Sequence, residues 1–191
     1  MALDILLLGP QGSGKGTQAK RIAEAYGVPH VATGDMFRAA VAEESELGRQ
    51  VAPILEEGRL VPDDLTIELI RERLADVEGF VLDGFPRTMA QAEALDSMLD
   101  DIGKPLDAVI LLQVSDEVAT ERLGNRALLE GRADDSPEAI RNRLRDYHEL
   151  TELVVDRYGQ AGIEFVVDGE QSVDDVFAAI EDALGGVTAR R

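Results

Sequence analysis

The stretch from Leu3 to Thr17, LDILLLGPQGSGKGT, decides the fold. It opens with an apolar run typical of a buried parallel strand, continues in a glycine-rich turn and ends in a helical pattern. The spacing Gly9-x-x-x-x-Gly14-Lys15 is that of a phosphate-binding loop, in which glycines let backbone N–H groups turn towards an anion. A helix N-terminus adds positive charge, and the lysine reaches the β- and γ-phosphates of a nucleotide. A glycine-rich hairpin turn is the competing interpretation, but strand, loop and helix signals follow in the required order.

The composition places the chain among ordinary globular proteins. Its 191 residues are the length of one domain, and 45% of them are hydrophobic. There is no cysteine, which excludes disulfides, thiolate metal sites and cysteine nucleophiles. No apolar run is long enough to span a membrane, and no basic segment precedes the first apolar stretch. We therefore expect a cytoplasmic protein without a signal peptide.

The charge is strongly acidic, with 38 acidic against 19 basic residues and a net charge of −19. Such a surface repels nucleic acids and anionic membranes, so neither is an expected partner. It also repels anionic substrates at long range, so phosphate binding must depend on a local cluster of arginines. The few lysines are Lys15, Lys20 and Lys104. Acidic excess with little lysine suits a high-salt cytoplasm, where salt screens self-repulsion, although a high-GC genome would also favour arginine over lysine.

Short apolar runs alternate with helical patterns along the chain. Strands are expected over residues 4–8, 28–32, 80–82, 107–114 and 162–167. Helices are expected over residues 17–26, 36–46, 48–57, 63–76, 88–101, 136–158 and 172–184, with another beginning at residue 115. The alternation predicts an α/β fold, a five-stranded parallel sheet flanked by helices, with the ligand at the carboxyl ends of the strands.

Two stretches break this alternation and are candidate flaps over the site. Residues 33–62 contain helical patterns with no strand between them, and residues 126–135 look like a short connection rich in Arg, Gly and Asp. Asp83 ends the third strand, where an acid can steer Mg²⁺ through water, with a helix cap as the alternative role. His30 and His148 are far apart and form no metal-binding spacing. The arginines in loops or beside the expected cleft suit bidentate phosphate contacts; they are Arg38, Arg87, Arg122, Arg126, Arg132 and Arg143.

Four motifs in this order resemble those of adenylate kinases, a nucleoside monophosphate kinase family of the P-loop kinases. They are GPQGSGKGTQ from Gly9, TGDMFR from Thr33, LDGFPR from Leu82 followed by Gln91, and GRADD from Gly131 followed by Arg143. The resemblance covers nearly the whole chain and includes the lysine–glycine–threonine variant of the loop. It implies the P-loop NTPase fold, with a core over residues 1–31, 62–125 and 137–191, an AMP-binding lobe over 32–61 and a lid over 126–136. Only five residues separate Arg126 from Arg132, so the lid resembles the short form without an extra β subdomain or a structural zinc.

The resemblance implies reversible transfer of a phosphoryl group, ATP + AMP = 2 ADP, by a monomer that uses Mg²⁺ with ATP and maintains adenine nucleotide homeostasis. By this likeness ATP is held by Gly12, Ser13, Gly14, Lys15, Gly16, Thr17, Arg126 and Gln171. AMP is held by Thr33, Arg38, Arg59, Leu60, Val61, Gly84, Phe85, Pro86, Arg87, Gln91, Arg132 and Arg143. The catalytic cations are Lys15, Arg87, Arg126, Arg132 and Arg143. Asp83, through water, and Thr17 are the metal ligands, and Asp134 and Asp135 tie down the lid or orient its arginines.

The implied chemistry agrees with the residues present. The acceptor is a phosphate oxygen that is already ionised, so catalysis needs positioning and charge stabilisation but no general base. Thr33 and Gln91 favour AMP, because a glutamine amide offers adenine both a donor and an acceptor, whereas uridylate–cytidylate kinases usually carry alanine and asparagine there. Two alternatives stay open: a UMP/CMP kinase, and a non-catalytic nucleotide sensor, against which the retained arginines and Lys15 argue.

Overall fold

A parallel β-sheet forms the centre of the molecule, as the sequence predicts. The computed structural model describes residues 2–130 and 132–188. Five strands pair in parallel in the order β2-β3-β1-β4-β5. They are β1 Asp4–Leu8, β2 His30–Ala32, β3 Phe80–Asp83, β4 Ala108–Gln113 and β5 Glu164–Asp168. Every residue of β1 is buried, in keeping with its central place and its unbroken apolar run.

Helices connect the strands, and several of them begin at a side-chain cap. The side chains of Ser45, Thr88 and Ser136 each accept a hydrogen bond from the first turn of the helix that follows. The helices are α1 Lys15–Tyr26, α2 Thr33–Ala42, α3 Glu46–Glu56, α4 Asp63–Leu74, α5 Met89–Asp101, α6 Asp116–Glu130, α7 Pro137–Asp146, α8 Glu152–Ala161 and α9 Val173–Thr188. A 3-10 turn, η1 Ala133–Asp135, precedes α7, and a π-helical segment, η2 Tyr147–Thr151, joins α7 to α8.

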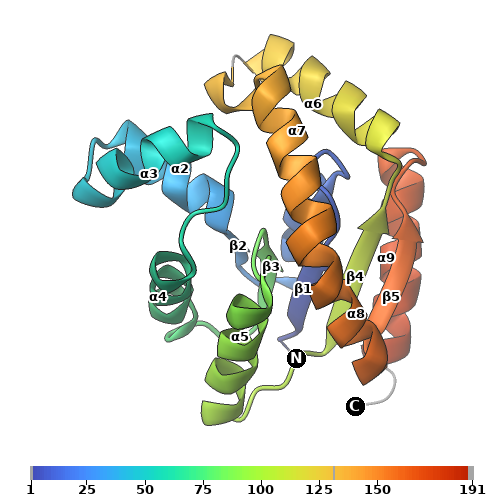
Figure 1. The fold of residues 1–191 in the computed structure, drawn as a ribbon. Helices are drawn as coiled ribbons and strands as arrows, with labels where there is room; N and C mark the ends of the chain where they lie inside the picture. The colour runs from blue at the N-terminus through green and yellow to red at the C-terminus, as the bar shows by residue number, and fades with distance from the viewer. Residues whose placement is uncertain (1, 131, 189–191) are drawn as a thin grey trace.

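The helices cover both faces of the sheet and so make three layers (Figure 1). On one face, side chains of α4, α5 and α8, including Ile70, Leu95 and Val154, pack against the strands. On the other face, α1 and α9 contribute Ile22 and Ile180. This double cover explains why the strands read as continuous apolar runs rather than alternating patterns.

Helices α2 and α3 form a small lobe beside the sheet, with its own apolar cluster of Phe37, Val51 and Val61 (Figure 1). The end of this lobe touches α7, where the Asn142 side-chain amide donates a hydrogen bond of 2.8 Å to the carbonyl of Glu57. The lobe therefore faces α7 across the carboxyl ends of the strands.

Two expectations about local structure were wrong. The helix expected over residues 36–46 begins at Thr33 and ends at Ala42, because the turn that follows places Ser45 as the cap of α3. Helix α6 runs on to Glu130, through residues expected to form a connection, because the sequence Ala-Leu-Leu-Glu before Gly131 strongly favours a helix. Gly131 lies outside the described residues. Within the described part of the chain, no helix combines the length and apolarity needed to cross a lipid bilayer.

Candidate functional site

The loop between β1 and α1 has the backbone of an anion cradle. Gly9, Gly12 and Gly14 have φ angles of +134°, +85° and +95°, which side chains with a Cβ rarely adopt. Helix α1 starts at Lys15 without a side-chain cap and without an acid in its first turn. Its first N–H groups can therefore receive a negatively charged ligand.

Lys15 folds back over this loop. Its Nζ donates to the carbonyls of Gly9 and Pro10, each at 2.7 Å. Burial lowers the pKa of Lys15 to about 8, against the opposing influence of the Asp83 carboxylate. The ammonium group thus stands at the loop, charged at neutral pH and less hydrated than a surface lysine.

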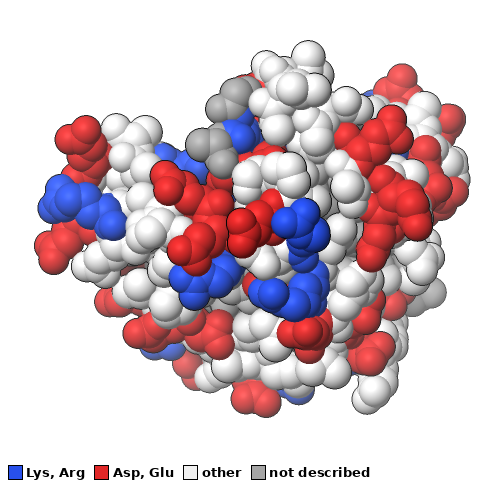
Figure 2. Space-filling model, turned by 45° about the horizontal axis from the view of Figure 1, so that its top comes forward, with Lys and Arg blue, Asp and Glu red and all other residues white. Residues whose placement is uncertain are grey.

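A cleft of about 520 Å³ opens over this loop and brings together predicted residues from the loop, the end of β3, the lobe, α6 and α7. The predicted residues in its lining are Gly12, Gly14, Lys15, Gly16, Thr17, Arg38, Arg59, Asp83, Gly84, Phe85, Pro86, Arg87, Arg122, Arg126, Arg132 and Arg143. On the face drawn in Figure 2, acidic side chains are spread widely, and several basic ones lie near the middle among them. The local cluster of arginines expected from the acidic composition is therefore present.

A hollow of about 40 Å³ adjoins the cleft and shares Gly84 and Arg87 with it. Its lining contains the remaining residues predicted for AMP, which are Thr33, Leu60, Val61 and Gln91. Two predicted residues, Ser13 and Gln171, line neither space. The Ser13 side chain is buried beneath the loop, and the exposed Gln171 donates from Nε2 to Asp168 at 3.2 Å. Their roles stay predictions.

Asp134 and Asp135 bind the arginines around η1, as expected. Asp135 accepts two hydrogen bonds from Arg126, at 2.7 and 2.8 Å, and one from Nη1 of Arg143. Asp134 accepts from Nη2 of Arg143 at 2.7 Å and lies 3.8 Å from Nη1 of Arg38. Burial opposes ionisation of Asp135, but Arg126 and Arg143 outweigh it and hold the pKa of Asp135 below its usual range. These carboxylates fix the direction of guanidinium groups that line the cleft.

Arg87 is anchored at three points beside β3. Its Nε donates to the carbonyl of Gly84 at 2.7 Å, and its own carbonyl accepts from the Thr151 hydroxyl at 3.0 Å. Its backbone N–H donates to Oε1 of Gln91 at 2.8 Å. Burial lowers the pKa of Arg87 to about 10, so it stays charged at neutral pH.

Asp83 stands at the carboxyl end of β3, facing the loop. A Cβ added at Gly16 would lie 3.6 Å from Oδ2 of Asp83, and Nε2 of His30 lies 3.7 Å from the same oxygen. Burial would raise the pKa of Asp83, but the nearby His30 and Lys15 outweigh it, and the pKa stays below its usual range. The described residues include no group of three or more His, Cys, Asp or Glu side chains that could hold a metal alone. One carboxylate with the Thr17 hydroxyl fits Mg²⁺ that arrives with a nucleotide and keeps several waters.

Several residues of the site were missed by the sequence analysis. Tyr147 and Thr151 line the cleft from η2, whose π-helical turn cannot be read from sequence periodicity. His30 approaches Asp83 only through the register of β2 with β3. Asp63 accepts hydrogen bonds from Nε2 of Gln91 at 2.7 Å and from Thr88 at 3.0 Å. Its sequence signal, an acid in the first turn of a helix, indicates a cap and nothing more.

Comparison with known proteins agrees with this geometry. The adenylate kinase family model matches residues 7–163. An adenylate kinase of Stenotrophomonas maltophilia (strain R551-3) is 49% identical over 185 residues, covering 95% of this chain and 99% of the relative. The adenylate kinase of Xanthomonas euvesicatoria pv. vesicatoria (strain 85-10) is 48% identical over 95% of this chain and 98% of the relative. The adenylate kinase of Cyanothece sp. (strain PCC 7425 / ATCC 29141) is 50% identical over 93% of this chain and 92% of the relative. The family model matches most of the chain, and the chain is about half identical to these relatives over nearly their whole length. The chain therefore belongs to the adenylate kinase family.

Proposed function

We propose that this chain transfers a phosphoryl group reversibly between ATP and AMP in the arginine-lined cleft, giving two ADP and so balancing the adenine nucleotides. Membership of the adenylate kinase family supports the activity. The observation that carries the placement is that Lys15 and seven arginines of the described residues line one cleft in a chain of net charge −19. A surface this acidic concentrates cations at one place only where anions must be held close together. The proposal includes a monomer acting in the cytoplasm, which the family resemblance supports.

The donor side of the proposed site is the phosphate loop. The phosphates of ATP lie on the loop N–H groups and the start of α1, and Lys15 leaves its two carbonyls to bind them. Asp83 and Thr17 would hold the Mg²⁺ that arrives with ATP, and the ion would neutralise part of the phosphate charge. Arg126 covers the ATP from α6, with its guanidinium directed by Asp135.

The acceptor side is the lobe and the end of β3. Arg38 and Arg87 bind the phosphate of AMP, and the base enters the hollow that Thr33 and Gln91 line. Arg132 and Arg143 bridge the phosphoryl group in transfer. The acceptor oxygen is already ionised at neutral pH, so these fixed cations accelerate the reaction by positioning and charge stabilisation alone. The lobe over residues 32–61 and the lid over 126–136 are the proposed moving parts, which exclude water from the reaction.

The test measures coupled initial rates with ATP and Mg²⁺ against AMP, GMP, CMP and UMP, at low and at multimolar KCl. Strong preference for AMP is expected. Preference for CMP or UMP would indicate a pyrimidine nucleotide kinase, and binding of nucleotides without transfer to any acceptor would indicate a sensor. Faster turnover at multimolar KCl than at low salt would support adaptation of the acidic surface to a high-salt cytoplasm.

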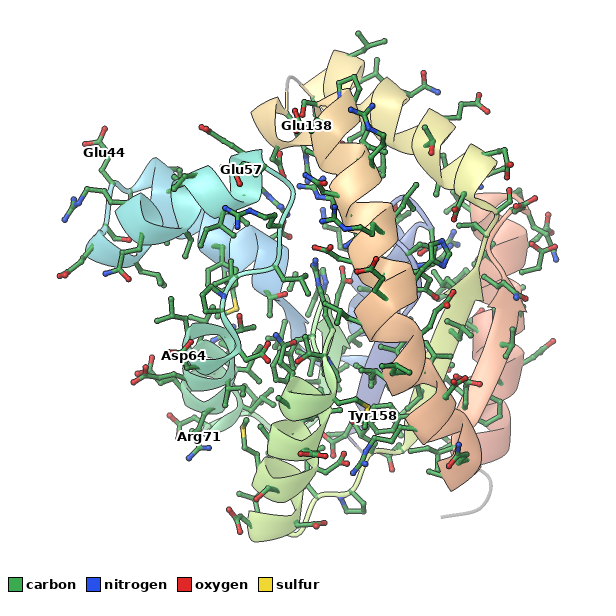
Figure 3. All side chains as sticks on the ribbon, in the orientation of Figure 1. Glu44, Glu57, Asp64, Arg71, Glu138 and Tyr158 are labelled. Atoms are coloured by element: carbon green, nitrogen blue, oxygen red, sulfur yellow. The ribbon has the colours of Figure 1, made fainter. Side chains whose placement is uncertain are left out.

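Variants locate the activity in the cleft. Lys15→Ala and Arg87→Ala should each lower kcat by about 10³-fold or more, the scale seen for cations that stabilise a transferring phosphoryl group. Circular dichroism should show their folds intact. Arg71→Ala is the matched control, because Arg71 lies exposed on α4, far from the cleft (Figure 3). Near-normal turnover by either cleft variant would contradict the placement.

A further inference from the structure

The side-chain amide of Gln91 is held from two sides. Gln91 lies in the first turn of α5, is 2% exposed and lines the hollow proposed for the AMP base. Its Oε1 accepts from the backbone N–H of Arg87 at 2.8 Å, and its Nε2 donates to Oδ1 of Asp63 at 2.7 Å. Asp63 is held in turn by the Thr88 hydroxyl, which donates to its other oxygen at 3.0 Å.

Neither partner of this amide can exchange its role. A backbone N–H can only donate, and a carboxylate can only accept. If the Gln91 amide rotated by half a turn, its oxygen would face the Asp63 carboxylate and its NH₂ would face the N–H of Arg87. Two hydrogen bonds would become two repulsive contacts in a buried place, so the amide has one allowed orientation.

This orientation decides what remains for a ligand. One hydrogen of Nε2 and one lone pair of Oε1 are left over, because each atom uses only part of its capacity on the protein. Adenine offers an acceptor at N1 beside a donor at its 6-amino group, which matches that pair. A 6-oxopurine such as hypoxanthine or guanine offers the reverse, a donor at N1 beside an acceptor at O6, and needs the rotated amide.

We propose that Asp63 is a positioning residue for base specificity, which locks Gln91 in the orientation that reads adenine and so rejects 6-oxopurine nucleotides. The proposal rests on the proposed function, because it takes the hollow as the site of the AMP base. Asp63 itself lines neither the hollow nor the cleft, so it acts through Gln91.

The test compares AMP with IMP, which differs only at position 6 and in its N1 hydrogen and carries no 2-amino group. The variant is Asp63→Asn, whose amide can either accept from Gln91 or donate to it, so that only the N–H of Arg87 still opposes rotation of the Gln91 amide. The matched control is Asp64→Asn, because Asp64 is exposed on the side of α4 that faces away from α5 (Figure 3). The wild type and Asp64→Asn should strongly prefer AMP. Asp63→Asn should lower the AMP:IMP ratio of kcat/KM by about tenfold, roughly the effect of one buried hydrogen bond, and the change should lie in KM.

The outcomes separate the two proposals. A wild type that does not use AMP refutes the proposed function. A wild type that uses AMP, with an Asp63→Asn variant that loses AMP and IMP activity alike or keeps the wild-type ratio, overturns the role of Asp63.

A second pair of variants tests the contact itself without relying on activity. Gln91→Glu sets two carboxylates against each other and should lower Tm, whereas the double variant D63N/Q91E restores a donor facing an acceptor and should recover Tm. The double variant should also lose preference for AMP over IMP, because the introduced carboxylate has no hydrogen to donate to N1 of adenine but can accept from the N1–H of hypoxanthine. No recovery of Tm would refute the lock even if Asp63→Asn alone proved too unstable to assay.

Discussion

Replacing Asp135 by asparagine tests how far this buried carboxylate stabilises the fold and directs the arginines around η1. The Asp135 side chain is fully buried and binds Arg126 of α6 and Arg143 of α7. Asparagine has the same shape, so it leaves no cavity, but it turns a charged acceptor into an amide whose NH₂ faces guanidinium groups. The change therefore removes the charge that holds two helices and two cations together.

The expected cost follows from the burial of the three groups. Breaking a buried ion pair costs about 3–5 kcal/mol. The lower end of this energy range applies here, because the Arg126 side chain is 29% exposed and Arg143 keeps its ion pair with Asp134. For a domain of this size, about 3 kcal/mol lowers Tm by roughly 6–12 °C. The kcat should also fall, since Arg126 and Arg143 lose their fixed direction.

The assay is thermal unfolding of Asp135→Asn beside Glu130→Gln. Glu130 binds Arg132 at 2.7 Å, but its side chain is 52% exposed, so this surface pair should contribute less than about 1 kcal/mol. If Asp135→Asn lost no more Tm than Glu130→Gln, the reasoning from burial would be refuted.

The lowered pKa of Asp135 also predicts how this stabilisation changes with pH. The pKa of Asp135 is lower in the folded state than in the unfolded chain. Its ionised form therefore contributes fully to the free energy of unfolding above about pH 3.9, the unfolded-state pKa, and this contribution is lost as pH falls through the folded-state pKa. The gap in stability between the wild type and Asp135→Asn should therefore narrow in acid.

Four further outcomes are expected. Because the pKa of Lys15 in the free protein is about 8, kcat/KM for ATP should fall as pH rises through that value. The kcat should persist to higher pH, since bound phosphates favour the charged ammonium form of Lys15. A kcat/KM that did not change up to pH 10 would contradict this prediction. The same shift means that the unfolded chain binds more protons between pH 8 and about 10.4, so the contribution of Lys15 to stability should rise with pH there in denaturant titrations. Gly12→Ala should destabilise the protein by about 1–3 kcal/mol and weaken ATP binding in calorimetry, because φ is +85° and the new Cβ would lie 2.7 Å from the carbonyl of Ala119. Thr151→Val should cost about 1 kcal/mol and raise KM for AMP in initial-rate measurements, because it leaves the carbonyl of Arg87 without its hydroxyl donor.

The central strand and the phosphate loop could be predicted from the sequence because their signals are local. An apolar run without alternation predicts a strand covered on both faces, and the glycine spacing after it predicts positive φ angles, which Gly9, Gly12 and Gly14 have. The fold class and the family followed from these signals and from three other short motifs.

What could not be predicted depends on contacts between distant segments. The bond of Asp63 to Gln91 spans 28 positions and exists only because the first turns of α4 and α5 meet. The approach of His30 to Asp83 depends on strand register. The extent of α6 differs from the prediction for another reason. The overall composition of residues 126–135 is that of a loop, but the helix-favouring residues come first and the helix breaker, Gly131, comes after them.

The two carbonyls that bind Lys15 act as competitors for every anion that approaches the loop. A chloride ion that took the ammonium would break two hydrogen bonds of 2.7 Å and supply one contact in return. A polyphosphate bound as proposed would bring several charged oxygens to the lysine, the loop N–H groups and the arginines at once, and would so replace both carbonyl contacts. In the proposed function, the resting position of Lys15 would therefore favour nucleotides over small anions as ligands of the loop.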